Sequence, residues 1–312
     1  MTNPRVALLA ALAVLTAAYA GYWFVDARRR AQKGQRGRPT FFEIAVGAVT
    51  NFFDTLGIGS FAPTTSVFKL RRIVPDERIP GTLNIGHAIP VVVQAFIFIA
   101  AVGVEIPTLF ATIAAAILGA WLGAGVVSGL PRRRIQIGMG IALLAAAAFF
   151  AMTNLGLFPG GGQALGLHGA LFGIGVAVIF VLGAFNTLGI GLYAPCMILI
   201  ALLGMNPRAA FPIMMGACAF LMPVASIRFI RAGSYSVGPS LGLMLGGIPA
   251  VLVAGLVVKS LPLTALRWLV VAVVAYAASA MLRSARAERE RPPAGGIDKD
   301  AADATYSVTL PS

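Results

Sequence analysis

Long apolar segments, separated by short polar or basic stretches, follow one another along almost the whole chain. A helix needs about 20 mostly apolar residues to cross the roughly 30 Å of hydrocarbon in a bilayer. Stretches of this kind predict membrane-crossing helices at 6–25, 81–102, 107–130, 135–158, 209–227, 237–258 and 262–282. Two longer apolar regions, 41–68 and 169–204, carry glycines and a proline near their middles, so each is expected to be a broken helix.

The same phrase stands in the middle of both broken regions. Residues 55–63 read TLGIGSFAP and residues 187–195 read TLGIGLYAP. Matching positions are 132 residues apart, and two further pairs keep this spacing, Pro75 with Pro207 and Pro80 with Pro212. The chain is therefore expected to consist of two related halves, 41–158 and 169–283, joined by an external linker at 159–168. Such a plan is common in secondary transporters and also suits a channel.

Two terminal segments lie outside these halves. Residues 1–40 contain the first apolar helix and a basic linker, and we expect an uncleaved anchor because the apolar run continues through Trp23-Phe24-Val25 to an arginine cluster. A cleaved signal peptide is the alternative, because Ala18-Tyr19-Ala20 resembles a cleavage site. Residues 284–312 form a cytoplasmic tail, in which 292–312 has too few apolar residues to build a core and is expected to be disordered.

Basic residues are concentrated at the ends of the apolar segments. The chain has a formal net charge of +13, with 58% hydrophobic and 11% charged residues, a composition outside the range of soluble α/β proteins. Clusters lie at 28–38, 69–78, 132–134, 228–231 and 283–291. Lysine and arginine gather in the cytoplasmic loops of membrane proteins, beside anionic lipid head groups, so these positions argue against nucleic-acid binding. The two cysteines lie in apolar segments and do not indicate a disulfide framework.

The side of the membrane on which each basic cluster lies depends on how the broken regions are placed. If 41–68 crossed the membrane fully, the basic loops at 69–78 and 132–134 would fall outside. If 41–68 instead turns at its glycines and leaves on its own side, all the clusters become cytoplasmic. Each half then has one re-entrant or broken hairpin and three full spans, so the second half is inverted relative to the first. The predicted fold is an all-α polytopic membrane protein with two inverted repeats, preceded by one extra N-terminal helix.

The glycines and prolines of the repeated phrase predict a binding site. Backbone that leaves the helix inside a bilayer is tolerated only where protein or water covers it, and such places are usually binding sites. Glycine permits a positive φ and the close approach of a ligand, while the start of the following half-helix offers N–H groups and a dipole to an anion. The alternative is that Gly-x-Gly only lets helices pack closely. The candidate positions are Thr55, Gly57, Gly59 and Pro63, with Thr187, Gly189, Gly191 and Pro195.

The two halves resemble the sulfite exporter TauE/SafE family of membrane transporters, whose halves each open with a Gly-rich segment followed by a proline. The matching stretches are GAVTNFFDTLGIGSFAP at 47–63 and LGAFNTLGIGLYAP at 182–195, and the resemblance covers about 41–283. The family often has three consecutive glycines before the proline, whereas here Ser60-Phe61 and Leu192-Tyr193 intervene. The resemblance implies transport of small sulfur-containing anions, such as sulfite or sulfonates, coupled to the proton gradient.

Polar residues inside the apolar segments are further candidates. Asp54 precedes the first phrase and Asn186 takes its place in the second, so only one half carries an ionisable group there. Such a group at membrane depth is costly and points to function. Asp54 is expected either to carry a coupling proton or to cap the next helical segment with Thr55. The differences expected to set selectivity are Asp54 against Asn186, Ser60-Phe61 against Leu192-Tyr193, and Thr64 against Cys196.

One face of the span at 81–102 also carries polar side chains. Asn84 and His87 lie on this face, with Gln94 further along it. His87 is expected either to line the substrate path and titrate near neutrality or to donate to a backbone carbonyl between packed helices. Glu43, close to the cytoplasmic end of the first broken region, is expected to pair with a nearby arginine.

The second half is rich in sulfur. Cys196 and Met197 follow its phrase, and residues 212–223 read PIMMGACAFLMP. Thiols and thioethers bind soft metals such as Cu(I), so a soft-metal permease using Cys196 and Cys218 is the main alternative to an anion transporter. Ordinary packing by methionine is the plainer explanation of the same residues.

These observations lead to one functional hypothesis, a secondary transporter of small anions that works by alternating access in the cell membrane. No HExxH, GxSxG or Walker-type loop occurs in the sequence, so no enzyme is expected. We also expect no cofactor, no resident metal ion and no nucleic-acid partner. A homodimer is left open.

Overall fold

Ten helices make up the part of the chain that the computed structural model describes, residues 4–157, 162–187 and 192–257 with isolated positions between 268 and 286. Within these residues no strand occurs beyond one isolated bridge. The helices are α1 (Pro4–Gln32), α2 (Phe41–Thr55), α3 (Phe61–Leu70), α4 (Ile79–Ala101), α5 (Ile106–Val127), α6 (Arg132–Asn154), α7 (Gly169–Asn186), α8 (Tyr193–Leu202), α9 (Ala210–Ala232) and α10 (Val237–Val257). The prediction of an all-α protein is confirmed.

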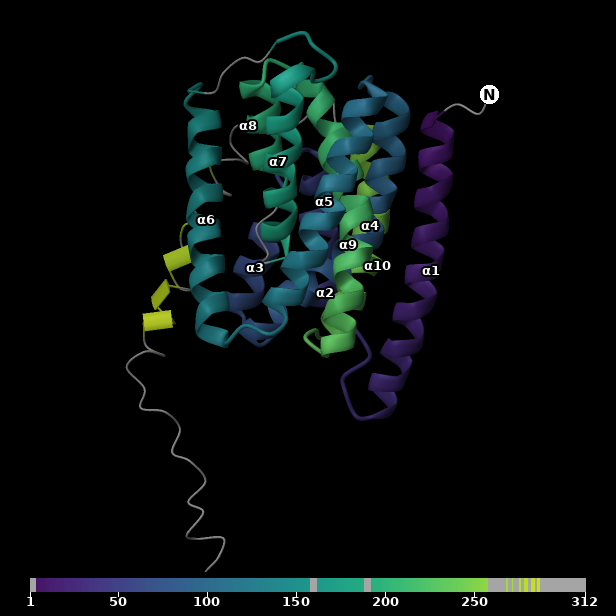
Figure 1. Ribbon diagram of the computed structural model, residues 1–312. Coiled ribbons are helices and arrows are strands. Elements are labelled where there is room, and N and C mark those ends of the chain that lie inside the picture. Colours follow the sequence, from purple (N-terminus) through teal and green to yellow (C-terminus); the bar gives the residue numbers. More distant parts are fainter. Residues whose placement is uncertain are drawn as a thin grey trace, which may run out of the picture.

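Six of the described helices are long and apolar enough to cross a membrane. They are α1, α4 with the short turn before it, α5, α7, α9 and α10. In addition, α6 runs the length of the bundle (Figure 1). The predicted span at 262–282 and the predicted tail at 292–312 lie outside the described residues, apart from isolated positions in the span.

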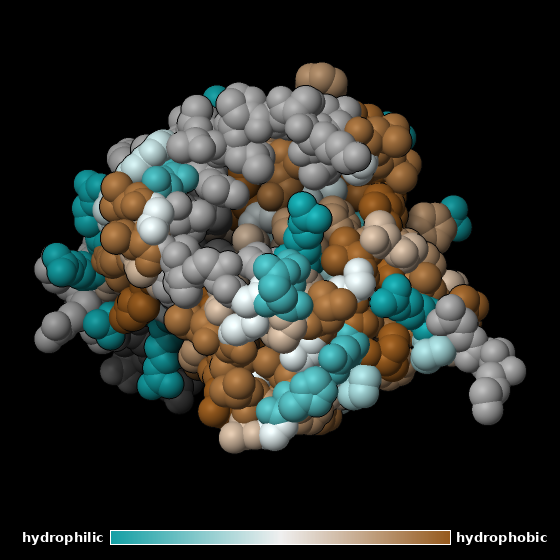
Figure 2. Space-filling view, turned by 90° about the horizontal axis from the view of Figure 1, so that it is seen from above, coloured by the Kyte–Doolittle hydropathy of each residue, from teal (hydrophilic) through white to brown (hydrophobic). Residues whose placement is uncertain are grey.

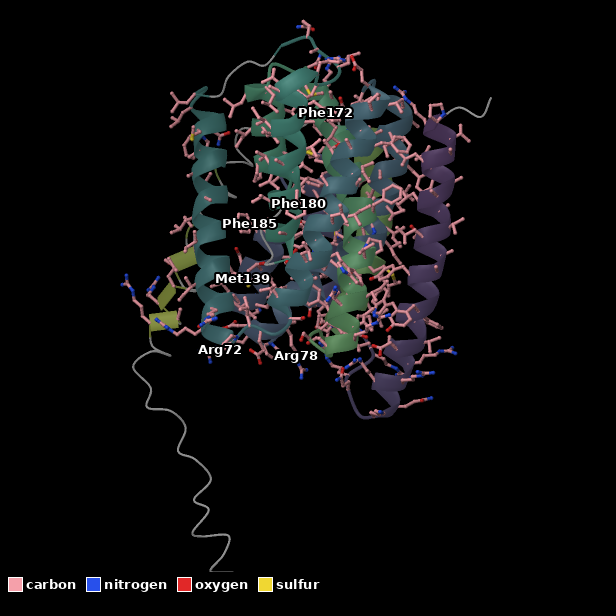
Figure 3. All side chains as sticks on the ribbon, viewed as in Figure 1. Arg72, Arg78, Met139, Phe172, Phe180 and Phe185 are labelled. Carbon is pink, nitrogen blue, oxygen red and sulfur yellow. The ribbon has the colours of Figure 1, made fainter. Side chains whose placement is uncertain are left out.

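Both apolar regions that carry the repeated phrase are interrupted where the sequence predicts. The first breaks between the end of α2 at Thr55 and the start of α3 at Phe61. Figure 1 shows this pair rising from the lower end of the bundle and returning to it. Arg72, just after α3, and Arg78, just before α4, accordingly lie at that lower end in Figure 3.

The second interrupted pair comes from the opposite end of the bundle. Figure 3 places Phe172, near the start of α7, at the upper end and Phe185, near its last turn, deeper in the molecule. The chain then breaks before α8, which runs back toward the upper end (Figure 1). The two interrupted pairs therefore have their outer ends at opposite ends of the bundle.

Glycines allow two pairs of helices to pack with their backbones in close contact. Helix α10 packs along α2, and α7 packs along α5. A Cβ atom at Gly246 would lie 1.9 Å from the carbonyl oxygen of Ile44, and one at Gly119 would lie 1.9 Å from that of Phe180. Any larger residue at these positions would force the helices apart. The α2–α10 and α5–α7 pairs flank α4 and α9, which pack against each other at the centre.

The outer surface of the bundle is apolar, as expected for a protein surrounded by lipid. Large side chains such as Val14 and Leu256 are 71% and 87% exposed. Figure 2, which views the molecule from above, shows hydrophobic residues over much of its visible surface. Helix α1 packs on the outside against α4 and α9, and its Tyr19 hydroxyl donates to the carbonyl of Ile85 at 3.2 Å.

The lower end of α2 is fixed by Glu43. Its carboxylate forms an ion pair with Arg36 and accepts the backbone N–H of Thr40, whose hydroxyl in turn accepts the N–H of Glu43. This reciprocal arrangement is a capping box, and it confirms the predicted pairing of Glu43 with an arginine.

Candidate functional site

The two glycines of the first phrase, Gly57 and Gly59, form the end of α2 and the turn that follows it. The N–H of Ile58 donates to the carbonyl of Phe53, and the N–H of Gly57 donates to that of Asp54, which is the Schellman pattern of a helix end. This pattern needs a left-handed residue, and Gly57 has a φ of 84°. Gly59 has a φ of 86° and begins the turn into α3. The sequence TLGIG thus stops one helix and redirects the chain within five residues.

The glycines of the first phrase are required for backbone conformation rather than for close helix packing. A Cβ atom at Gly57 would lie 3.4 Å from the ring of Phe211, and one at Gly59 would lie 3.9 Å from Tyr193, which are ordinary contacts with side chains. The close-packing alternative therefore describes Gly119 and Gly246 but not these two positions. Gly189 and Gly191 of the second phrase lie outside the described residues.

Both half-helices that follow the phrases begin in the same way. Pro63 is the third residue of α3, and Pro195 is the third residue of α8. Proline lacks an N–H group, but N–H groups in the first turn of a helix have no partner within the helix, so the proline removes no hydrogen bond there. Each helix thus starts inside the bundle with first-turn N–H groups that have no partner within the helix.

Asp54 is the centre of a buried hydrogen-bond network that joins the two phrases. It is 2% exposed. One of its carboxylate oxygens accepts the backbone N–H of Ser60 at 2.5 Å, and the other accepts from the amide nitrogen of Gln94 at 2.8 Å. The amide oxygen of Gln94 accepts the hydroxyl of Tyr193 at 2.6 Å. Gln94 therefore bridges the first phrase to the second, a role that the sequence did not reveal.

A small cavity lies where the two phrases meet. Its volume is about 10 Å³, room for about one water molecule. Residues of both phrases line it, together with side chains of α4 and α9: Asp54, Gly59, Ser60, Phe61, Val91, Asn186, Leu192, Tyr193, Cys218 and Met222. Four of the predicted site residues, Asp54, Gly59, Asn186 and Cys218, are thus brought together around one cavity.

Two buried polar atoms in this lining have no hydrogen-bond partner. They are the hydroxyl oxygen of Ser60 and the amide oxygen of Asn186, on residues that are 1% and 0% exposed. The amide nitrogen of Asn186 faces the oxygen of Asn84 at 3.5 Å, and the nitrogen of Asn84 donates to the carbonyl of Pro80, which fixes both amide orientations. Because an unpartnered buried polar atom is costly, Ser60 and Asn186 indicate a position for a water or a ligand.

His87 is held by two side chains, and not by the backbone carbonyl that was one of the two predictions made for it. Its Nδ1 lies 3.1 Å from the amide oxygen of Asn51, and its Nε2 lies 3.1 Å from the hydroxyl of Thr64. The Asn51 nitrogen donates to the carbonyl of Gly47, so its oxygen must accept from His87. Nδ1 therefore carries a proton, and the ring is held by two side chains rather than by a backbone carbonyl. His87 is not among the described lining residues.

Thr55, Thr187 and Cys196 are not among the described lining residues of the cavity. Thr55 donates to the carbonyl of Asn51 and accepts from Gln94, whereas Thr187 donates to the carbonyl of Ala184. Cys196 is completely buried, and both cysteines are free thiols.

The polar network belongs almost entirely to the first half. At the spacing of 132 residues, Asn51, His87 and Gln94 correspond to Gly183, Ala219 and Ser226. Asp54 likewise corresponds to the neutral Asn186. The second half therefore contributes Tyr193, Asn186 and sulfur-containing side chains to the site, while the first half contributes the carboxyl group of Asp54.

Comparison with known families gives one match. The family model described as "Sulfite exporter TauE/SafE" matches residues 1–150, a range that includes α1 and the first phrase and ends before the second. No curated protein and no solved structure matches the chain. The match confirms the resemblance to this family over residues 1–150, and the six candidate spans support a multi-pass membrane protein.

Proposed function

We propose that this chain, whose first 150 residues are similar to the TauE/SafE family of sulfite exporters, is a secondary transporter of small anions. The proposed substrates are sulfur-containing oxyanions such as sulfite or a sulfonate, and the proposed mechanism is alternating access. The central cavity is the proposed substrate site.

One observation carries this proposal above the others. Two half-helices, α3 and α8, begin at the same cavity, and their partners α2 and α7 come from opposite ends of the bundle (Figure 1). Helix N-termini present free N–H groups and a positive partial charge. Broken helices that meet near the midplane are the usual site of substrate binding in transporters built from repeats.

The arrangement of the helices supports the inverted-repeat prediction. Exchanging the two halves converts the α2–α10 contact into the α7–α5 contact, and it leaves the α4–α9 contact in place. The α4–α10 contact becomes the α9–α5 contact in the same way. A twofold axis parallel to the membrane would produce this pattern together with the opposite directions of the two interrupted pairs.

The positions of the basic clusters support a cytoplasmic location for the lower end in Figure 1. The end of α1, the loop between α3 and α4, the start of α6 and the end of α9 all lie there. These segments carry the clusters at 28–38, 69–78, 132–134 and 228–231. By the positive-inside rule, the opposite end faces outward.

The size of the cavity indicates which conformational state of the proposed transporter the structure represents. A volume of about 10 Å³ does not hold a sulfur oxyanion, and the lining residues are buried. The structure therefore corresponds to an occluded state, and loading requires the two phrases to separate on one side.

Flux measurements in proteoliposomes test the proposed function. Uptake of sulfite, sulfate, thiosulfate, sulfonates and carboxylates would be compared with and without a pH gradient. We expect saturable uptake of at least one sulfur oxyanion, stimulated by the gradient. If inserted and monodisperse protein transported none of the anions in the panel, the proposal would be contradicted.

A soft-metal permease is the second candidate, because Cys218 and Met222 line the cavity. Replacing the sulfur-containing residues Cys196, Cys218, Met214, Met215 and Met222 together separates the two functions. We expect anion flux to persist after these replacements. Loss of Cu(I) uptake with no anion flux in the unmodified protein would favour the metal function instead.

A further inference from the structure

The proposed anion site already holds a negative group of the protein's own. The Asp54 carboxylate accepts the N–H of Ser60, the residue that precedes the first turn of α3. This is where a helix N-terminus would attract a substrate anion. The corresponding residue of the second half is the neutral Asn186. The two phrases therefore differ. In the first, a carboxylate of the protein already occupies the position at the start of the helix that would attract an anion.

A substrate anion in this cavity would meet acceptors rather than cations. Among the described residues that line it, none is lysine, arginine or histidine. Asn186 presents its amide oxygen, because its nitrogen faces Asn84. An oxyanion beside an ionised Asp54 would place two negative charges close together in a buried site, where their repulsion is only weakly screened.

On the basis of the proposed function, we propose that Asp54 binds one proton whenever the cavity binds one anion, so that the two are carried together. The proton comes from the solution on the side where the anion binds and is taken up by a carboxylate oxygen of Asp54. Both leave on the other side, where the carboxylate forms again. The pair crosses with one negative charge from the anion and one positive charge from the proton.

The network around Asp54 can accept this proton by rearranging its hydrogen bonds, at the cost of the one that Gln94 donates to Thr55. In the structure, Gln94 donates to Asp54 and accepts from Tyr193. If the amide of Gln94 turns over, its oxygen accepts from a protonated Asp54 and its nitrogen donates to the Tyr193 hydroxyl. Protonation also weakens the acceptor that holds the N–H of Ser60 and so frees the start of α3 for the anion.

The other titratable groups near Asp54 do not supply this function. Tyr193 of α8 donates to Gln94, Cys218 of α9 lies across the cavity, and His87 of α4 is held by Asn51 and Thr64. Helix α10, which packs along α2, has no titratable residue within Val237–Val257. Lys69 of α3 is paired with Asp76 at the lower end of the molecule. Asp54 is therefore the group placed to couple the proton to the anion.

Proton uptake on anion binding tests the inference in the unmodified protein. Titration calorimetry with methanesulfonate, which stays an anion throughout, would be run in buffers of different ionisation enthalpy from about pH 6 to about pH 9. We expect about one proton taken up per anion on the alkaline side, where the affinity should fall about tenfold per pH unit. Binding without proton uptake and without this fall would overturn the inference alone. Failure to bind any anion would overturn the proposed function as well.

The Asp54→Asn variant provides the transport test, with Glu43→Gln as the matched control. Asparagine is the residue of the second half at this position, and Glu43 is another buried carboxyl of α2 that lies away from the cavity. We expect Asp54→Asn to exchange methanesulfonate across the membrane at a rate independent of pH and to lose accumulation driven by a pH gradient. The control should keep that accumulation. Accumulation by Asp54→Asn would contradict the inference, and if this variant does not insert, the proton count of the unmodified protein decides.

Discussion

Gly57 shows at the scale of one residue how the repeated phrase acts. Its φ of 84° ends α2 and costs a residue with a side chain about 1–2 kcal/mol. The surrounding space is filled only by side chains, the ring of Phe211 and the sulfur of Met197. The residue is therefore constrained by its conformation, and a larger side chain would also disturb the turn that leads to the cavity.

Gly57→Leu is expected to abolish anion transport while the protein still inserts. The strained turn would displace Gly59 and Ser60, which line the cavity. Gly173→Leu is the matched control, because Gly173 is exposed on α7 and a Cβ atom there would meet nothing within 4 Å. Flux and size-exclusion profiles of both variants check this prediction. Normal transport by Gly57→Leu would return this glycine to a simple packing role.

Tyr193→Phe is expected to loosen the occluded state. The change removes the hydroxyl that donates to Gln94 and leaves a buried amide oxygen unpaired, at a cost of about 1 kcal/mol. Cys218, which is 2% exposed, should then react faster with a small thiol reagent in a Cys196→Ala background. Tyr22→Phe, at an exposed position of α1, serves as the control. An unchanged reaction rate would argue that the hydrogen bond from Tyr193 to Gln94 does not hold the two phrases together.

The sequence predicted several of the residues that line the cavity, but it did not predict their hydrogen-bond partners. The glycines, the proline and the Asp54–Asn186 difference could be read from the repeat itself. The bridge by Gln94 could not, because it depends on α4 passing between α2 and α8, and the sequence does not specify that contact. The partners of His87 could not be predicted for the same reason, since Asn51 and Thr64 come from two other helices.

At the scale of helices, the predictions rest on the length of each apolar segment and on the glycines and prolines that interrupt it. Both broken regions were recognised because glycine and proline interrupt apolar runs that exceed the thickness of a bilayer. The packing of α2 on α10 and of α7 on α5 was not recognised. It depends on single glycines such as Gly119 and Gly246, which look like any others among the 36 glycines of the chain.

Gly119→Val tests the close contact of α5 with α7. The new side chain would overlap the carbonyl oxygen of Phe180, and we expect a loss of about 3 kcal/mol in stability. Thermal denaturation in detergent should show the loss. Gly21→Val, on an exposed face of α1 with no atom within 4 Å of the new Cβ, should leave the transition unchanged. Equal stability of the two variants would mean that α5 and α7 are separated in the membrane.

At the scale of the molecule, the charge distribution and the topology favour the same proposed orientation. The two interrupted pairs have their outer ends at opposite ends of the bundle, and the basic loops gather at one of them (Figure 1). The sequence could predict this combination because the number of membrane crossings in each half and the positive-inside rule together leave one arrangement. The last predicted span and the tail lie outside the described residues.

Cysteine labelling on a background without Cys196 and Cys218 checks the orientation. Arg72→Cys and Arg208→Cys place exposed thiols in the loops that follow the two interrupted pairs. We expect an impermeant reagent to label Arg72→Cys only from the cytoplasm and Arg208→Cys only from outside. Labelling of both from the same side would refute the inverted arrangement.

Counterflow tests most directly whether the chain is a carrier of small anions. Proteoliposomes loaded with unlabelled sulfite are diluted into a trace of labelled sulfite, and the labelled anion inside is followed over time. An alternating-access carrier predicts a transient accumulation above the equilibrium level, which Gly57→Leu should lack. Simple equilibration without this overshoot, or no uptake of label, would contradict the proposed function.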